Sequence, residues 1–135
     1  MKCSCRKGLR VVLIILVSLS VMGLSGCSQE AKKERHWRKG EKYFTENKFK
    51  EAIIEYQNVL QADPENPQAH YKLGVSYLKS SQIRQAYAEF LKSVELDPTL
   101  NDARLELGTL YLMSKDLPKA KEQAEGSLSL LRPGQ

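Results

Sequence analysis

The feature that most constrains this chain is a residue pattern that repeats every 34 positions. Glycine recurs with that spacing at Gly40, Gly74 and Gly108. Tyrosine, alanine and proline keep the same phase, at Tyr43, Tyr77, Tyr111, Ala52, Ala86, Ala120, Pro64 and Pro98. A fixed period of this length is typical of helix–turn–helix units that stack and share one core. Such arrays hold other molecules on extended surfaces, so the pattern favours a binding function.

Each unit contains two stretches with apolar residues at helical spacing. In the second unit we predict helices over residues 67–80 and 83–96, and in the third unit a second helix over 117–131. Asp63 and Asp97 precede prolines and are expected to end helices, since the residue before proline avoids the helical region. Pro67 suits a helix start, where a missing N–H costs nothing. The expected fold class is all-α.

The repeated residues resemble the tetratricopeptide repeat. The second unit carries its pattern as His70, Leu73, Gly74, Tyr77, Ala86, Phe90, Ser93 and Pro98. The corresponding residues of the first unit are His36, Lys39, Gly40, Tyr43, Ala52, Tyr56, Val59 and Pro64. Those of the third are Arg104, Leu107, Gly108, Tyr111, Ala120, Ala124, Ser127 and Arg132. The resemblance implies an α-solenoid of three repeats, at 33–66, 67–100 and 101–134.

The third repeat departs from the pattern in its second helix. Ala124 replaces the aromatic residue, Lys121 replaces an apolar or aromatic one, and Gly126 costs roughly 1 kcal/mol relative to alanine inside a helix. A terminal repeat exposes a polar outer face, so this helix is a candidate cap. The residues after it are too few for the separate capping helix that the family usually adds. A self-capped array and the front of a longer array both remain open.

The N-terminus has the features of an export signal. Lys2, Arg6, Lys7 and Arg10 precede an apolar stretch over 11–21, which is too short for a permanent membrane span. Residues 24–27 read Leu-Ser-Gly-Cys and resemble the bacterial lipobox. The resemblance implies a signal peptide over 1–26, cleavage between Gly26 and Cys27, diacylglycerol on the Cys27 sulfur and usually an acyl chain such as palmitate on its amine. Residues 27–32 are then a lipidated tether.

Removal of the signal changes the charge and the cysteine count. The net charge is +5, and four basic residues lie in 1–26 with no acidic one, so the mature chain carries +1. We therefore expect no nucleic-acid partner. Only Cys27 would remain, which excludes an intramolecular disulfide. A basic cluster begins the mature chain and is either a solvated helix face or a contact for anionic headgroups; its members are Lys32, Lys33, Arg35, Arg38, Lys39 and Lys42.

No catalytic motif is recognisable in the sequence. His36 and His70 occupy a packing position of the repeat and are expected to be structural, and Glu51 with Glu55 is interpreted as a solvated like-charge pair. We expect no enzyme activity, no metal, no small-molecule substrate, and no cofactor apart from the covalent lipid.

The family resemblance implies that the first helices line a concave peptide-binding face. The candidate groove residues are Trp37, Glu41, Phe44, Tyr71, Val75, Leu78, Leu105, Thr109 and Leu112. This set is mainly apolar and aromatic, which suits an extended or helical peptide. Trp37 and Glu41 stand where the chaperone-type clamp for C-terminal carboxylates needs lysine and asparagine, so no such clamp is expected.

These features together predict a lipid-anchored, non-catalytic scaffold for protein–protein interaction in the bacterial envelope. By resemblance to small lipoproteins of this kind, an assembly factor for a membrane, exopolysaccharide-export or secretion complex is favoured. The alternatives are a self-associating structural lipoprotein, a pilotin, or an outer-membrane assembly accessory. The anchor predicts a periplasm-facing position, at the outer membrane in a Gram-negative cell because Ser28 follows Cys27.

Overall fold

The computed structural model describes residues 29–131. The predicted signal peptide, the cleavage site at Gly26 and Cys27, and the first residues of the tether lie outside this range. The described residues begin with a helix over 29–45, here called the first helix. Five more follow, namely α2 (Phe49–Ala62), α3 (Pro67–Lys79), α4 (Ile83–Leu96), α5 (Asn101–Met113) and α6 (Leu117–Leu131). The predicted bounds of α4 and α6 are confirmed, and α3 ends one residue earlier than predicted.

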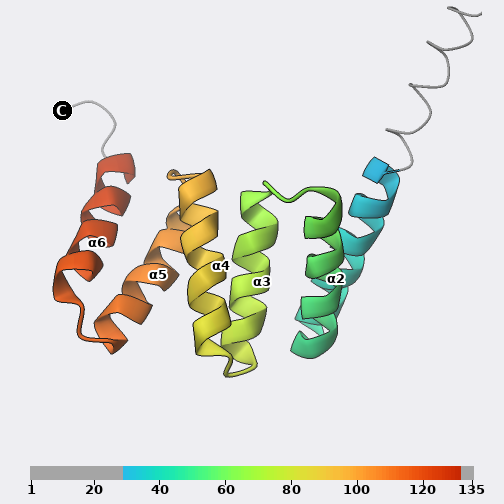
Figure 1. Ribbon diagram of the computed structural model, residues 1–135, viewed down its shortest axis with the longest axis horizontal. Helices are drawn as coiled ribbons and strands as arrows, with labels where there is room; N and C mark the ends of the chain where they lie inside the picture. The colour runs from blue at the N-terminus through green and yellow to red at the C-terminus, as the bar shows by residue number, and fades with distance from the viewer. Residues whose placement is uncertain (1–28, 132–135) are drawn as a thin grey trace, which may run out of the picture.

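The helices stand side by side in the order of the chain (Figure 1). From α2 to α6, each helix packs most extensively on its neighbours in the chain, α2 with α3, α3 with α4, α4 with α5, and α5 with α6. All regular structure between residues 29 and 131 is helical, which confirms an all-α solenoid. Among these helices, none is both long enough and apolar enough to cross a membrane.

The turn inside each helix pair repeats with the same period as the sequence. Asn47, Ser81 and Lys115 have φ values of 58°, 62° and 62°. The residue after each donates its backbone N–H to the carbonyl of a tyrosine five residues earlier, at 2.9 Å from Tyr43, Tyr77 and Tyr111 in turn. A left-handed residue followed by a bond of this kind is the usual way to end a helix and satisfy its last carbonyls. The period therefore fixes the turns as well as the helices.

The two helices of the first and second repeats approach closely at a glycine. A Cβ on Gly40 would lie 2.8 Å from Cε1 of Tyr56, and a Cβ on Gly74 would lie 2.7 Å from Cε1 of Phe90. Both rings are fully buried. Glycine is required at these two positions because no real side chain fits beside the ring. The close approach of the two helices therefore explains why glycine recurs at these two positions of the repeat.

The core consists of two clusters that each cross a boundary between repeats. One contains Ala52, Ile53, Tyr56 and Leu73, and it joins α2 to α3. The other contains Ala86, Phe90, Leu107, Leu110, Tyr111 and Ala120, and it joins α4 to α5 and α6. Each repeat thus completes the core of the one before it, as expected of a solenoid.

Candidate functional site

The groove residues predicted on the first helix are half-buried, and they contact α2 of their own repeat or α3 of the next one. The Trp37 ring meets the Tyr56 ring edge to face, with 5.7 Å between centroids. The Lys72 ammonium lies 5.3 Å from the Phe44 ring centroid, close enough for a cation–π contact. Both aromatic groove residues therefore have structural partners.

Glu41 is held by a network that joins the first two repeats. The Tyr56 hydroxyl donates to Glu41 Oε1 over 2.7 Å, and Lys72 Nζ lies 3.0 Å from the same carboxylate. Burial, and then the bond to Glu41, raises the pKa of Tyr56 far above its usual range. The Glu41 carboxylate thus positions Lys72 and Tyr56, and the Lys72 ammonium compensates its charge.

The groove residues predicted in the second repeat are also half-buried. Tyr71, Val75 and Leu78 pack against the core cluster that joins α4 to α5. The rings of Tyr71 and Phe90 are 6.1 Å apart. Burial is the main cause of the raised pKa of the Tyr71 hydroxyl, followed by the negative charges of Asp102 and Glu106.

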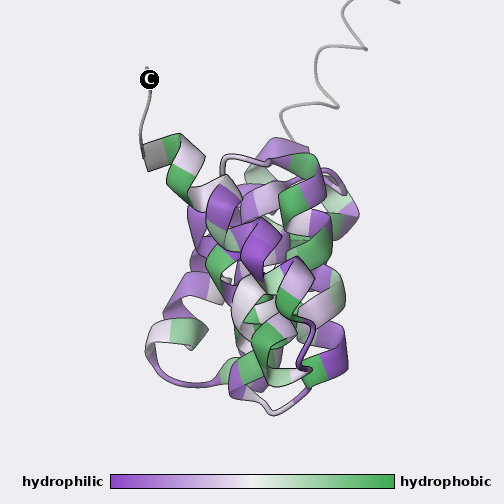
Figure 2. Ribbon diagram, turned by 90° about the vertical axis from the view of Figure 1, so that its left-hand side faces the viewer, coloured by the Kyte–Doolittle hydropathy of each residue, from purple (hydrophilic) through white to green (hydrophobic). Residues whose placement is uncertain are grey.

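The third repeat presents the equivalent positions to solvent. Leu105 and Leu112 are each 57% exposed, and Thr109 between them is also exposed. These residues border a hollow of about 340 Å³ at the α5–α6 end of the array, which we call the open face. Its lining is completed by Arg104, Gly108, Leu117, Ala120, Lys121 and Ala124. Figure 2 views this end and shows hydrophobic residues interspersed with hydrophilic ones along its helices.

Residues at the same position of the repeat differ in exposure between the second and third repeats. Tyr71 and Leu78 stand 34 residues before Leu105 and Leu112, and they are partly covered where α5 packs on the second repeat. Among the described residues, nothing covers Leu105 and Leu112 in the same way. The structure thus separates the nine predicted groove residues into six that are half-buried within the array and three that are exposed.

Both histidines pair with a glutamate of the second helix of their own repeat. His36 Nδ1 lies 2.6 Å from Glu55 Oε2, and His70 Nδ1 lies 2.6 Å from Glu89 Oε2. The side chain of Glu55 is only 13% exposed. The interpretation of Glu51 and Glu55 as a solvated pair is therefore wrong for Glu55, whose carboxylate turns inward to bind the imidazole. Sequence alone gave no sign of this, because the partner lies 19 residues away.

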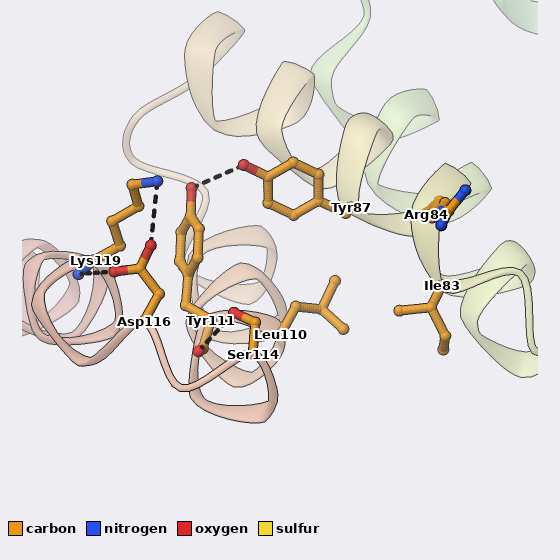
Figure 3. A pocket seen from close by; sticks show the side chains of 8 residues that line it. All are labelled: Ile83, Arg84, Tyr87, Leu110, Tyr111, Ser114, Asp116 and Lys119. Atoms are coloured by element: carbon orange, nitrogen blue, oxygen red, sulfur yellow. Dashed lines mark hydrogen bonds and ion pairs between the residues drawn. The ribbon is translucent and has the colours of Figure 1, made fainter.

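A second hollow, of about 390 Å³, lies between the start of α4 and the turn from α5 to α6. Figure 3 shows its lining residues, which are Ile83, Arg84, Tyr87, Leu110, Tyr111, Ser114, Asp116 and Lys119. The hydroxyls of Tyr87 and Tyr111 are 3.2 Å apart, and Lys119 Nζ lies 3.2 Å from Asp116 Oδ2. Burial, and then the Tyr87 hydroxyl, raises the pKa of Tyr111 to about 12.

The charges around this second hollow are mostly satisfied by one another. The Lys119 ammonium pairs with Asp116 and also lies 5.4 Å from the Tyr111 ring centroid. We did not predict this hollow, because it is formed at a boundary between repeats that the pattern of a single repeat does not describe. Within residues 29–131, no three His, Cys, Asp or Glu side chains gather closely enough to hold a metal ion.

Family models match the centre of the chain. A TPR repeat model matches residues 40–81, and a tetratricopeptide repeat model matches residues 67–100. The matched stretch ends before the third repeat, whose second helix departs from the pattern. No curated protein matches the chain in sequence.

Solved structures with the same arrangement of helices include peptide-binding domains. The first TPR of Spaghetti (RPAP3), bound to the HSP90 peptide SRMEEVD, is 28% identical over 78% of this chain and 82% of its own, with a TM-score of 0.69. A MamA RS-1 double mutant is 26% identical over 74% of this chain, with a TM-score of 0.70. The alignment spans only 56% of that MamA chain. The TPR2B domain of yeast Sti1, in complex with an Hsp70 peptide, is 23% identical over 72% of this chain and 78% of its own, with a TM-score of 0.67, and shows the shared fold.

Proposed function

We propose that this chain, which carries tetratricopeptide repeats over residues 40–100, is a lipid-anchored scaffold that binds a protein partner in the bacterial envelope. TPR domains mediate protein–protein interaction, as the peptide-bound Spaghetti domain illustrates. The lipobox-like residues 24–27 support the anchor, and the absence of a recognisable catalytic motif in the sequence supports a non-catalytic role. By resemblance to small envelope lipoproteins, the proposed complex is one for exopolysaccharide export or secretion.

The observation that carries the binding role is the open face. Leu105 and Leu112 are more than half exposed around one hollow, although the same positions of the second repeat are half-buried and pack against the core. Leu117 on α6 is 63% exposed and borders the same hollow. Aliphatic side chains gathered at a concave site are typical of a surface that a partner covers.

The internal repeats also indicate what kind of segment fits this face. In the second repeat the equivalent residues are covered by α5, which contributes Leu107, Leu110 and Tyr111 to the shared core. An amphipathic helix with an aliphatic and aromatic face is therefore the expected partner segment. A chaperone-type clamp for an acidic C-terminal tail is not expected, because Trp37 and Glu41 stand where that clamp needs lysine and asparagine.

The proposal is tested by combining a crosslinker with open-face variants. A photo-crosslinking residue replaces exposed Thr109 in the full chain, expressed in its own cells. We expect it to capture a component of an envelope complex. The double variant Leu105→Ser, Leu112→Ser is expected to reduce capture at least about tenfold, because two aliphatic contacts each contribute about 1 kcal/mol or more. Trp37 and Tyr71 are poor choices here, since their removal would also weaken the fold.

Ile54→Ser is the matched control. Ile54 is 58% exposed, like the two leucines, but it lies on α2 away from the open face. Capture that survives in the double variant, or that falls equally in the control, would contradict a docking role for this face. Capture of a second copy of the chain would favour self-association, the second candidate that the exposed leucines support.

A further inference from the structure

The first helix carries five cations on one side. At 3.6 residues per turn, Lys32, Arg35, Arg38, Lys39 and Lys42 fall within about a third of the helix circumference, and all five are exposed. Glu34 and Glu41 lie outside this sector. We call these five residues the basic face. Its members come from the basic cluster of the sequence, from which the fold separates Lys33.

Lys33 has two carboxylate partners, whereas most residues of the basic face have none among the described residues. It projects toward α2, where its ammonium pairs with Asp63 at 3.2 Å and with Glu30 at 2.9 Å. On the basic face, Arg38 pairs with Glu34 at 3.2 Å and Lys42 reaches Glu46 only at 4.0 Å. Within residues 29–131, no carboxylate pairs with Lys32, Arg35 or Lys39. The face therefore presents uncompensated positive charge.

The same side of the corresponding helices is buried in the other two repeats. The residues 34 positions after Arg35, Lys39 and Lys42 are Ala69, Leu73 and Ser76, all buried as α3 packs on the first repeat. The next equivalents, Ala103, Leu107 and Leu110, are buried as well. In α3 and α5 this side packs against the preceding repeat. In the first helix the same side is exposed and carries positive charge. Covering it with another apolar helix would bury unpaired cations at a high cost.

We propose that the basic face lies on the anionic phospholipid headgroups of the membrane that holds the lipid on Cys27. This inference rests on the proposed anchor. Cys27 is two residues before the described helix and five before Lys32, so the tether keeps the basic face at the headgroups. The stretch from Lys32 to Lys42 is about 15 Å long as a helix and can lie flat on the bilayer. The open face then points away from the membrane, because it lies at the opposite end of the array (Figure 1).

The membrane is favoured over an acidic protein because of this proximity. A tethered surface is present at a high effective concentration whether or not a soluble partner is nearby. Basic residues next to a bilayer bind anionic lipid with an affinity that falls as salt rises, because the interaction is screened over about 10 Å at moderate ionic strength.

The test uses the mature chain, residues 27–135, with Cys27→Ser, so that no acyl chain contributes. It retains every residue that the structure describes. Co-sedimentation is measured with phosphatidylcholine vesicles, with and without phosphatidylglycerol. We expect binding only when phosphatidylglycerol is present, and weaker binding as salt is added. The triple variant Lys32→Glu, Arg35→Glu, Lys39→Glu is expected to bind about 100-fold more weakly, at roughly fivefold for each basic residue.

The matched control reverses the charge of three lysines outside the basic face, with the substitutions Lys50→Glu, Lys92→Glu and Lys121→Glu. All three are exposed and lie on α2, α4 and α6, so the net charge changes equally while the basic face is intact. Binding close to that of the unsubstituted chain is expected. Both variants are compared by circular dichroism to show that the fold is retained.

Two results would overturn the inference. The first is that the triple variant and the control bind equally well, since the attraction would then be general. The second is that the unsubstituted chain binds neither vesicle. If the triple variant also stopped co-purifying with a protein in cells, that second result would assign the face to an acidic partner. The anchor is checked separately by labelling the full chain with a palmitate analogue, with Cys27→Ser as the unlabelled reference, so the two proposals fail independently.

Discussion

At the scale of single residues, the three equivalent glycines are not equivalent in space. A Cβ on Gly74 would meet the buried ring of Phe90, whereas the nearest side-chain atom to a Cβ on Gly108 would be Cβ of Gln123 at 3.4 Å, an ordinary contact. The difference arises because Ala124 stands where the earlier repeats have Tyr56 and Phe90. Sequence periodicity gives the three glycines one role, but only two of them perform it.

This contrast predicts opposite effects of alanine. Gly74→Ala is expected to lower the free energy of unfolding by about 1–3 kcal/mol, because the ring of Phe90 has no room to move. Gly108→Ala is expected to raise it by up to about 1 kcal/mol, since alanine favours the helix and meets no clash. Urea unfolding followed by circular dichroism measures both. A destabilised Gly108→Ala variant would show that the α5–α6 crossing is tighter than the structure has it.

A second prediction at this scale concerns Tyr111. Its pKa is raised to about 12, first by burial and then by the Tyr87 hydroxyl, whereas a tyrosine in an unfolded chain titrates near 10. Between about pH 10 and 12 the unfolded chain releases this proton and the folded chain keeps it, so stability falls as the pH rises. Below about pH 10 both states hold the proton, and this contribution is constant.

Tyr111→Phe removes that titration. The unsubstituted chain is expected to lose stability more steeply than the variant over this interval, by up to about 1.4 kcal/mol per pH unit. The measurement is the urea midpoint as a function of pH. The tyrosines other than Tyr87, which bonds to Tyr111, have the same surroundings in both chains, so their titration cancels in the difference. Parallel curves would refute the assignment.

At the scale of the elements, α6 is the least supported helix. In α4, Ser93 donates to the Pro67 carbonyl over 2.8 Å and Glu89 binds His70. In α6, Ser127 stands 34 positions after Ser93, and Gln123 stands 34 positions after Glu89. The buried Oγ of Ser127 and Oε1 of Gln123 have no hydrogen-bond partner within the described residues. A buried polar atom without a partner costs about 1–3 kcal/mol. Leu128 is also 54% exposed.

Restoring the missing ring should stabilise this element. Ala124→Phe places an aromatic side chain against Gly108 and fills part of the hollow of about 340 Å³. We expect a gain of about 1 kcal/mol, less than full burial because the open face leaves one side of the ring in water. Hydrogen exchange of the α6 amides, followed by mass spectrometry, should slow by a corresponding factor of about five. Ala88→Phe is the control, on an exposed site of α4; equal slowing in both variants would contradict the packing explanation.

At the scale of the whole molecule, the array has two unlike ends. The first helix presents the basic face, and the α5–α6 end presents the aliphatic open face. In a solenoid each repeat contacts only the neighbouring repeats, so the two ends can contact different surfaces. The proposed scaffold uses this directly, with one end on the membrane and the other toward a protein partner.

The sequence by itself determined the fold, since the 34-residue period predicted two helices in every repeat. This was possible because each repeat contacts only its neighbours, so local pattern and tertiary packing carry the same information. The left-handed turn residues Asn47, Ser81 and Lys115 also keep the period. Only Asn47 is of a type that favours this conformation, so Ser81 and Lys115 gave no composition signal.

The tertiary structure decided which side chains are available to a partner. The sequence treats Trp37, Tyr71 and Leu105 as one class of groove residue, because they occupy the same position of the repeat. Exposure depends instead on whether another helix follows. The next repeat partly covers Trp37 and Tyr71, whereas no helix among residues 29–131 covers Leu105. Likewise, only folding separates Lys33, which pairs across the helices, from the uncompensated cations beside it. Whether a side chain is exposed to a partner depends on which helices pack against it, and the type of residue does not determine that.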